Sequence, residues 1–91
     1  MRHRATGDFW KAYDALPDQI QRLADKNYAL LRLSPEHPSL RFKLMTTPRG
    51  RRYSVRVGLR YRALGSPIEE GVLWEWIGTH AEYDKLLAGK A

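Results

Sequence analysis

The residues best suited to chemistry lie in one basic segment and around one histidine. The segment from Arg41 to Arg62 holds eight of the chain's sixteen Lys and Arg residues and no Asp or Glu. Many of its cations alternate with apolar residues at the two-residue period of a β-strand, so one sheet face should be positively charged. Guanidinium groups donate paired hydrogen bonds to phosphate, which suits an RNA or DNA backbone. Acidic residues of a partner protein would suit the same face.

The strand pattern predicts which polar residues point away from the core. With Tyr53, Val55 and Val57 turned inward, the alternate residues of that strand turn outward. The residues that we assign to nucleic-acid binding on this surface are Lys43, Arg51, Arg52, Ser54 and Arg60, with Arg56 and Arg62 as candidates for direct contact with a reacting phosphate.

His80 is the strongest single candidate for proton transfer. It stands at the start of a predicted helix, where the helix dipole favours the neutral ring and hence a base. Tyr83 and Asp84 follow at helical spacing and can share its helix face. A histidine in this position could equally be a local capping or packing residue.

Composition restricts the other possibilities. A net charge of +6 indicates nucleic acid or an acidic protein as partner. The chain has no cysteine, and neither His3 nor His37 stands at metal-ligand spacing, so we expect no metal and no cofactor. No apolar run could span a membrane, and Met1–Trp10 lacks the apolar region of a signal peptide. We therefore expect a cytoplasmic protein without a membrane partner.

Two helices are predicted in the first third of the chain. Asp8 can cap a helix over Phe9–Leu16, and Pro17 can be the first residue of a second helix that ends at Leu33. The two form a helical hairpin. Residues 1–7 are compatible with a short edge strand or a loose arm.

Strands with a period of two follow the helices. The expected strands begin at Leu40, Arg52, Tyr61 and Val72, with a loop over Gly65–Gly71 and Gly78 ending the last strand. Trp74 and Trp76 are expected on one face, with Ile77 on the other, and core packing explains them better than base stacking.

The last element is a short helix from Ala81 to about Ala88. Thr79 and Glu82 have the spacing of a capping box. The fold class is therefore α+β. A single domain over residues 1–91 packs the N-terminal helical hairpin on a four-stranded antiparallel sheet, with a fifth strand allowed, and ends in the short C-terminal helix.

This order of pieces resembles the RelE/ParE superfamily, the toxins of bacterial type II toxin–antitoxin systems. The resemblance runs from about Phe9 to Leu87. It rests on Phe9–Tyr13, Leu16-Pro17, Pro35–Leu40, Tyr53–Val57, Tyr61–Leu64 and Trp76–Asp84. RelE-like members cut mRNA in the ribosomal A site, whereas ParE-like members poison DNA gyrase.

The resemblance implies roles for individual residues. Arg62 matches the arginine of a Tyr-Arg strand motif that helps hold the scissile phosphate, and Arg56 and Ser54 fall where RelE has lysines. His80 falls where the ribonucleases place a catalytic Arg or His, and Tyr83 is near a C-terminal tyrosine. The chain departs from the pattern in two ways. Ser54 replaces a basic residue, and the basic segment has no carboxylate to act as a base.

The implied activity is a metal-independent mRNA endoribonuclease that inhibits translation on the ribosome. His80 would be the general base or acid, Arg62 and Arg56 would stabilise the phosphorane, and Tyr83 would position RNA or assist proton transfer. A cognate antitoxin would cover the positive face. Two alternatives remain at this stage, a ParE-like gyrase inhibitor and an RNA-binding module without activity.

Overall fold

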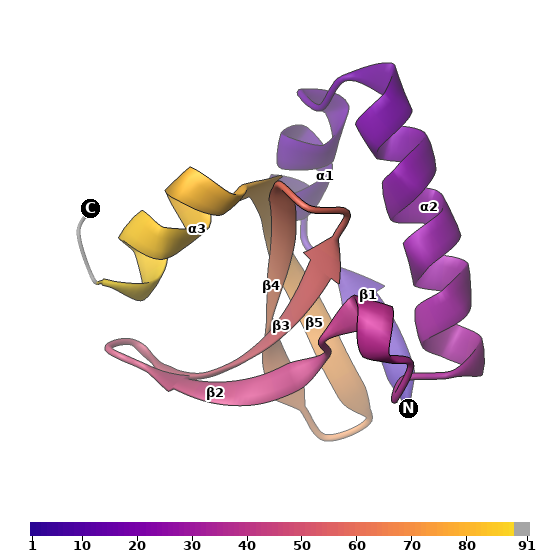
Figure 1. Ribbon diagram of the computed structural model, residues 1–91. Coiled ribbons are helices and arrows are strands. Elements are labelled where there is room, and N and C mark those ends of the chain that lie inside the picture. The colour runs from indigo at the N-terminus through magenta and orange to yellow at the C-terminus, as the bar shows by residue number, and fades with distance from the viewer. Residues whose placement is uncertain (89–91) are drawn as a thin grey trace.

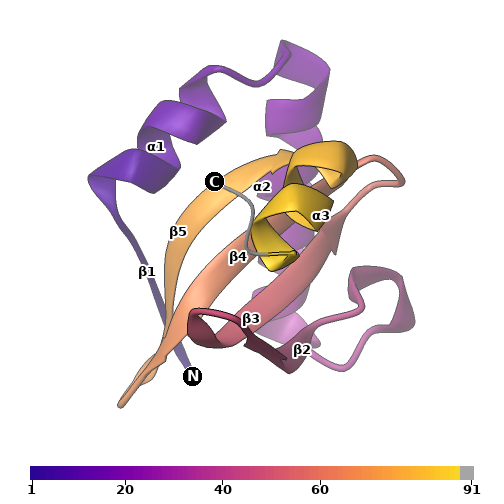
Figure 2. The same ribbon diagram turned by 90° about the vertical axis from the view of Figure 1, so that its left-hand side faces the viewer.

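A five-stranded sheet separates two N-terminal helices from one C-terminal helix in the computed structural model, which describes residues 1–88 (Figures 1 and 2). The elements in chain order are β1 (Arg2–Ala5), α1 (Gly7–Asp14), α2 (Asp18–Leu33), a 3-10 turn η1 (Pro38–Leu40), β2 (Lys43–Thr47), β3 (Gly50–Val57), β4 (Tyr61–Ile68), β5 (Gly71–Thr79) and α3 (His80–Leu87). The predicted α+β class is confirmed.

The sheet has the order β1-β5-β4-β3-β2, and its four later strands are antiparallel neighbours. Residues 1–7 contain a strand rather than a loose arm, because β1 pairs with β5. This pairing is parallel, from Arg2 beside Gly71 to Ala5 beside Trp74, so the sheet is mixed and not wholly antiparallel as predicted. A parallel neighbour is possible because α1 and α2 lie between β1 and the rest of the sheet in the chain.

The first helix begins earlier than predicted, at Gly7. Thr6 is its N-cap, since the Thr6 hydroxyl accepts a hydrogen bond from the Phe9 N–H at 3.1 Å. Asp8, the predicted cap, lies in the first turn, where its charge suits the helix dipole. The helix ends at Asp14, and Leu16 lies beyond it in the core.

The second helix ends at Leu33 as predicted, although Pro17 is its N-cap and not its first residue. The next predicted strand starts too early. Leu40 belongs to η1 and is fully buried, and β2 begins only at Lys43. Between them Arg41 has φ 46°, a left-handed conformation that interrupts the extended backbone.

β4 is longer than the sequence indicated, so the predicted loop over Gly65–Gly71 is wrong. β4 pairs with β5 as far as Ile68 beside Gly71. Pro67 is tolerated because β3 pairs with β4 only as far as Gly65, which leaves β4 as an edge at the proline. Gly78 does not end β5, which runs to Thr79.

A register shift between Leu64 and Gly65 changes which residues of β5 face the helices. Trp74 is 5% exposed and Ile77 is 3% exposed, and both lie in the core. Trp76, which pairs with Leu64, turns to the opposite face. The prediction that Trp74 and Trp76 share a face is therefore wrong, because a β-bulge adds a residue to the two-residue period. Core packing of Trp74 is confirmed.

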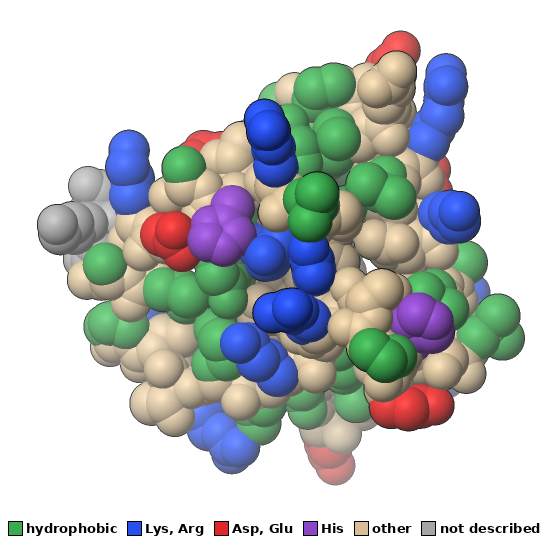
Figure 3. All heavy atoms as spheres, in the orientation of Figure 1, with side chains coloured by type: hydrophobic (Ala, Val, Ile, Leu, Met, Phe, Trp, Pro, Cys, Tyr) green, Lys and Arg blue, Asp and Glu red, His purple; other side chains and the backbone are tan. Residues whose placement is uncertain are grey.

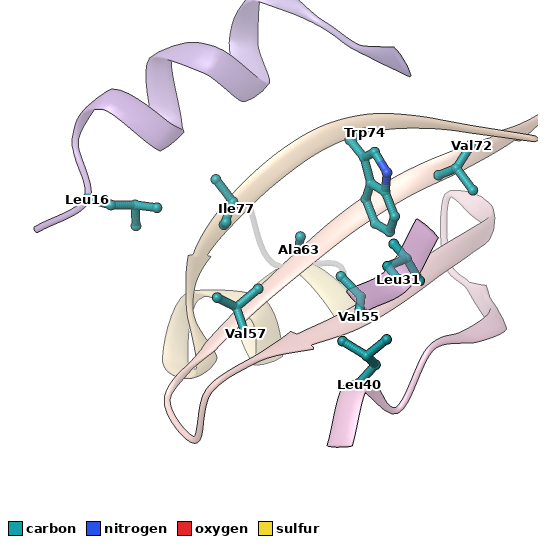
Figure 4. Close-up of a cluster of buried hydrophobic side chains, with 9 residues drawn as sticks. All are labelled: Leu16, Leu31, Leu40, Val55, Val57, Ala63, Val72, Trp74 and Ile77. Carbon is teal, nitrogen blue, oxygen red and sulfur yellow. The ribbon is translucent and has the colours of Figure 1, made fainter. Parts of the chain in front are cut away.

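The main core fills the space between the helices and the sheet (Figure 4). Its buried members are Leu16, Leu31, Leu40, Val55, Val57, Ala63, Val72, Trp74 and Ile77. The inward positions of β3 are thus Val55 and Val57, as predicted. The alternate residues of β3 and β4 lie on the other face, where α3 crosses the sheet.

Candidate functional site

His80 is fixed at the junction of β5 and α3. The capping box predicted for Thr79 and Glu82 is present, with the Glu82 N–H donating to the Thr79 hydroxyl at 3.2 Å and the Thr79 N–H donating to the Glu82 carboxylate at 3.3 Å. The His80 N–H donates to the Arg60 carbonyl at 2.7 Å. The start of the helix is therefore tied to the β3–β4 turn.

The His80 ring contacts Asp84 one helical turn later. His80 Nδ1 lies 3.1 Å from Asp84 Oδ2, and both side chains are open to solvent, at 45% and 62% exposure. When the imidazole is neutral, this contact favours the tautomer with the proton on Nδ1. Nε2 is then the unprotonated nitrogen and is free to accept a proton from a substrate.

Two arginines lie on the same sheet face, directly across from one another. Arg56 of β3 pairs with Arg62 of β4, and Arg62 pairs in turn with Gly78 near the end of β5. Arg62 Nη1 donates to the Tyr61 carbonyl at 2.7 Å, and Arg56 Nε donates to the Gly58 carbonyl at 3.1 Å. These bonds hold both guanidinium groups close to the backbone of the turn.

The environment of Arg62 is electropositive. Partial burial, followed by the charge of Arg56, lowers the pKa of Arg62 below its ordinary value. An arginine nevertheless stays charged near neutral pH. The ion pairs found within residues 1–88 do not involve Arg56 or Arg62. Two cations without an ion-pair partner in this part of the chain can bind an anion, and the nearby Asp84 carboxylate offsets only part of the positive charge around Arg62.

Arg41 adds a third positive charge that the sequence did not assign to the site. Its charge also lowers the pKa of Arg62, and it follows η1 with φ 46° and ψ 40°. A left-handed conformation at a residue other than glycine costs on the order of 1 kcal/mol, a cost often found at functional positions. We call Arg41, Arg56 and Arg62 the arginine cluster. Figure 3 shows Lys and Arg side chains gathered on this face beside a histidine and an acidic side chain.

Tyr83 and Ser54 lie beneath this surface. Tyr83 is 7% exposed and Ser54 is 2% exposed, and their hydroxyl oxygens are 2.9 Å apart. Ser54 is therefore on the predicted face but covered by α3. The Tyr83 ring lies 5.8 Å from the His80 ring, between centroids.

The other residues assigned to nucleic-acid binding are distributed unevenly. Lys43 is exposed on the same face, across from Ser54, and Arg60 is exposed in the β3–β4 turn. Arg52 lies on the same face, with Nε 3.7 Å from Glu75 Oε1. Arg51 alternates with Arg52 in β3 and so turns to the opposite face.

The features that would indicate a metal site or a membrane-spanning helix are absent from residues 1–88. No three His, Asp or Glu side chains lie close enough together to hold a metal ion in this part of the chain. Its helices are all too short or too polar to cross a membrane. An apolar cavity of about 230 Å³ lies under α1 and α2, on the sheet face opposite the arginine cluster, and none of the cluster lines it.

The arrangement defines an α+β fold with a helical hairpin on one sheet face and a cationic site beside a terminal helix on the other. No family model and no curated protein matches the sequence. A chain of the archaeal RelE–RelB complex from Pyrococcus horikoshii OT3 superposes with a TM-score of 0.64 and 17% identity, covering 86% of this chain and 92% of that chain. A chain of the RelB–RelE antitoxin–toxin complex from Methanococcus jannaschii gives a TM-score of 0.64 and 13% identity, covering 91% and 96%. The fold is therefore RelE-like.

Proposed function

We propose that the protein is the toxin of a type II toxin–antitoxin system and that it cuts mRNA on the ribosome. The observation that carries the proposal is the His80–Asp84 pair beside the cross-strand arginines Arg56 and Arg62 on one open face. A proton acceptor next to fixed cations is what cleavage of an RNA phosphodiester requires. The RelE-like fold supports the toxin assignment.

The chemistry assigns one task to each kind of residue. Nε2 of His80 takes the proton of the ribose 2′-hydroxyl, whose oxygen attacks the adjacent phosphorus while the bond to the 5′-oxygen breaks and that oxygen takes a proton from water. In the alternative assignment, His80 in its protonated form protonates the leaving 5′-oxygen. Arg62 and Arg56 stabilise the negative charge that develops on the phosphorane. The products are a 2′,3′-cyclic phosphate and a 5′-hydroxyl end.

A single acid–base residue leaves much of the acceleration to other factors. Such a group typically raises the rate of the reaction by about 10²–10⁴-fold. In-line placement of the 2′-oxygen must supply much of the remainder, and a ribosome that holds the mRNA rigidly can provide it. We therefore expect weak cleavage of free RNA and strong cleavage of mRNA in the ribosomal A site.

The partner that we propose is a small antitoxin. The two solved structures described above are complexes of RelE with RelB. The arginine cluster lacks a carboxylate partner within residues 1–88, so an acidic or amphipathic antitoxin segment would provide its counter-charges. Covering this face would at the same time exclude RNA.

The test is expression of the wild type and of the variants His80→Ala and Arg62→Ala, with growth and mRNA ends followed together. The wild type should arrest growth and cut mRNA within codons, and both variants should grow and leave mRNA intact. Arg22→Ala is the matched control, because Arg22 is an exposed cation on α2, on the other side of the sheet. Full toxicity in both site variants would overturn the assignment, as would DNA breaks with intact mRNA, which would indicate gyrase as the target.

A further inference from the structure

Helix α3 carries His80 and Asp84, yet few groups attach it to the sheet. Tyr83 is the buried member of its eight residues, and Leu86 is 37% exposed. The capping box and the His80 N–H bond hold only the first turn. Figure 2 shows α3 lying across the sheet, on the side nearer the viewer. The direction of α3 over the sheet therefore depends mainly on how Tyr83 is held.

Tyr83 is held by a buried hydroxyl partner. Its hydroxyl oxygen lies 2.9 Å from Ser54 Oγ, and it also donates to Met45 Sδ at 3.6 Å. Ser54 stands in the middle of β3, between Lys43 of β2 and Leu64 of β4. Two buried hydroxyl groups satisfy each other here, and a buried hydroxyl left without a partner is costly. Because a hydrogen bond is directional, the pair fixes the rotation of α3 as well as its distance from β3.

The Tyr83–Ser54 hydroxyl pair also determines where His80 and Asp84 lie, because all three α3 residues are on one side of the helix. His80, Tyr83 and Asp84 stand at positions i, i+3 and i+4, so they occupy one side of α3. A rotation of α3 that broke the Tyr83 contact would move the imidazole and its carboxylate away from Arg62. The Tyr83 hydroxyl itself faces Ser54 in a 7% exposed side chain, so it is not open to a substrate.

We propose that Tyr83 and Ser54 are positioning residues: their buried hydroxyl pair holds α3 so that His80 and Asp84 face the arginine cluster. The inference concerns the geometry of the helix, and its catalytic consequence rests on the proposed ribonuclease function. It gives Tyr83 a different role from that of a group acting on RNA, and Ser54 a different role from an RNA contact. Both residues act through α3.

The structural part is tested without RNA. Amide hydrogen exchange of α3 is measured on the purified full chain for the wild type, Tyr83→Phe, Ser54→Ala and the double variant. Each single variant should exchange faster in α3 by about 2- to 12-fold, the range that corresponds to the net value of one hydrogen bond. The double variant should exchange no faster than the single variants, because all three lack the same bond and the double variant leaves no buried hydroxyl without a partner. Exchange in α2 should not change.

The catalytic part is tested on ribosomes programmed with mRNA. Both single variants should lower kcat by a similar small factor and leave KM unchanged, since the arginines that bind phosphate remain in place. Tyr53→Phe is the matched control, because Tyr53 lies on the same strand but faces the main core and should change neither kcat nor α3 exchange.

Two results would overturn the proposal. Unchanged α3 exchange in Tyr83→Phe and Ser54→Ala would show that the hydroxyl pair does not hold the helix, whatever the activity. If Tyr83→Phe lowered kcat by about 10²–10⁴-fold while Ser54→Ala kept full activity, Tyr83 would be a catalytic acid or base. If no variant or wild type cuts RNA, the exchange measurement still decides the positioning role, while the ribonuclease function alone fails.

Discussion

Asp84 Oδ2 lies 3.1 Å from His80 Nδ1, one helical turn away, in a pair that is open to solvent on the cationic face of the sheet. This contact gives the histidine a defined tautomer and a defined ring orientation. The carboxylate that the basic segment lacks is thus supplied from α3. A histidine oriented in this way, with Nε2 free, is better suited to accept a proton than a histidine that only caps a helix.

Replacing the carboxylate should impair catalysis without removing the histidine. In Asp84→Asn the side-chain carbonyl can still accept from Nδ1–H, but the amide group can also donate to Nδ1 and favour the wrong tautomer. We expect mRNA cleavage to fall by at least about 10-fold, towards the roughly 10⁴-fold cost of a wrong tautomer in a catalytic triad. Asp14→Asn, an exposed carboxylate on α1, is the control. Equal activity of the two variants would contradict the role of the pair.

The cross-strand arginines should reduce the stability of the folded protein. Like charges directly opposite each other in a sheet are destabilising, by about 0.2–1 kcal/mol. Arg56→Gln should therefore raise the free energy of unfolding by about this amount, as measured by urea denaturation at low salt, and should lower cleavage activity. Added salt should reduce the gain in stability because it screens the repulsion. A loss of stability in this variant would mean that Arg56 serves the fold and not an anion.

The N-terminal strand should make stability depend on pH through His3. Trp74 Nε1–H donates to His3 Nδ1 at 3.1 Å, which a protonated Nδ1 cannot accept. Burial, then the positive N-terminus and Arg32, lowers the pKa of His3 below its ordinary value of 6.5. The unfolded state therefore binds the proton more readily than the folded state does. The stability that neutral His3 contributes is complete above pH 6.5 and is lost as the pH falls through the folded-state pKa of His3.

Urea denaturation at several values from about pH 8 to about pH 5 measures this effect. The free energy of unfolding should fall on the acid side more steeply in the wild type than in His3→Gln, whose amide oxygen can still accept from Trp74. Identical slopes for the two proteins would exclude His3 as a source of the pH dependence. The fluorescence of Trp74 reports the same transition, since its indole contacts the titrating ring.

The β1–β5 contact makes one glycine far more sensitive than another. Gly71 has φ 155°, and a Cβ atom there would collide with the backbone of Arg2. Gly71→Ala should therefore separate β1 from β5 and lower the melting temperature. A Cβ at Gly7, in the first turn of α1, would meet no atom within 4 Å. Gly7→Ala should be neutral or stabilising, by up to about 1 kcal/mol. Equal melting temperatures for the two variants would count against the parallel β1.

The sequence predicted the parts of the fold that depend on local signals. The helical hairpin follows from apolar spacing and Pro17, and the capping box at Thr79 follows from two residues at fixed spacing. The β-bulge at Glu75 of β5 and the parallel pairing of β1 were not predictable, because both depend on which strands become neighbours. The bulge in turn reversed the face assigned to Trp76.

The placement of the residues proposed for the site was predictable for a similar reason. His80, Arg56 and Arg62 belong to strongly patterned segments, so their face could be inferred from periodicity. Arg41 was missed because its side chain direction depends on a left-handed backbone angle that no residue pattern marks. The burial of Ser54 was missed because periodicity shows which face a residue occupies but not which helix covers that face.

The most direct test of the central claim is cleavage of an mRNA whose A-site codon carries a single 2′-deoxy nucleotide at the scissile position, on ribosomes incubated with the purified protein. We predict that the all-ribose mRNA is cut to a 2′,3′-cyclic phosphate and a 5′-hydroxyl end, that the 2′-deoxy mRNA stays intact, and that His80→Ala cuts neither. Cleavage of the 2′-deoxy mRNA, or undiminished cleavage by His80→Ala, would contradict the account.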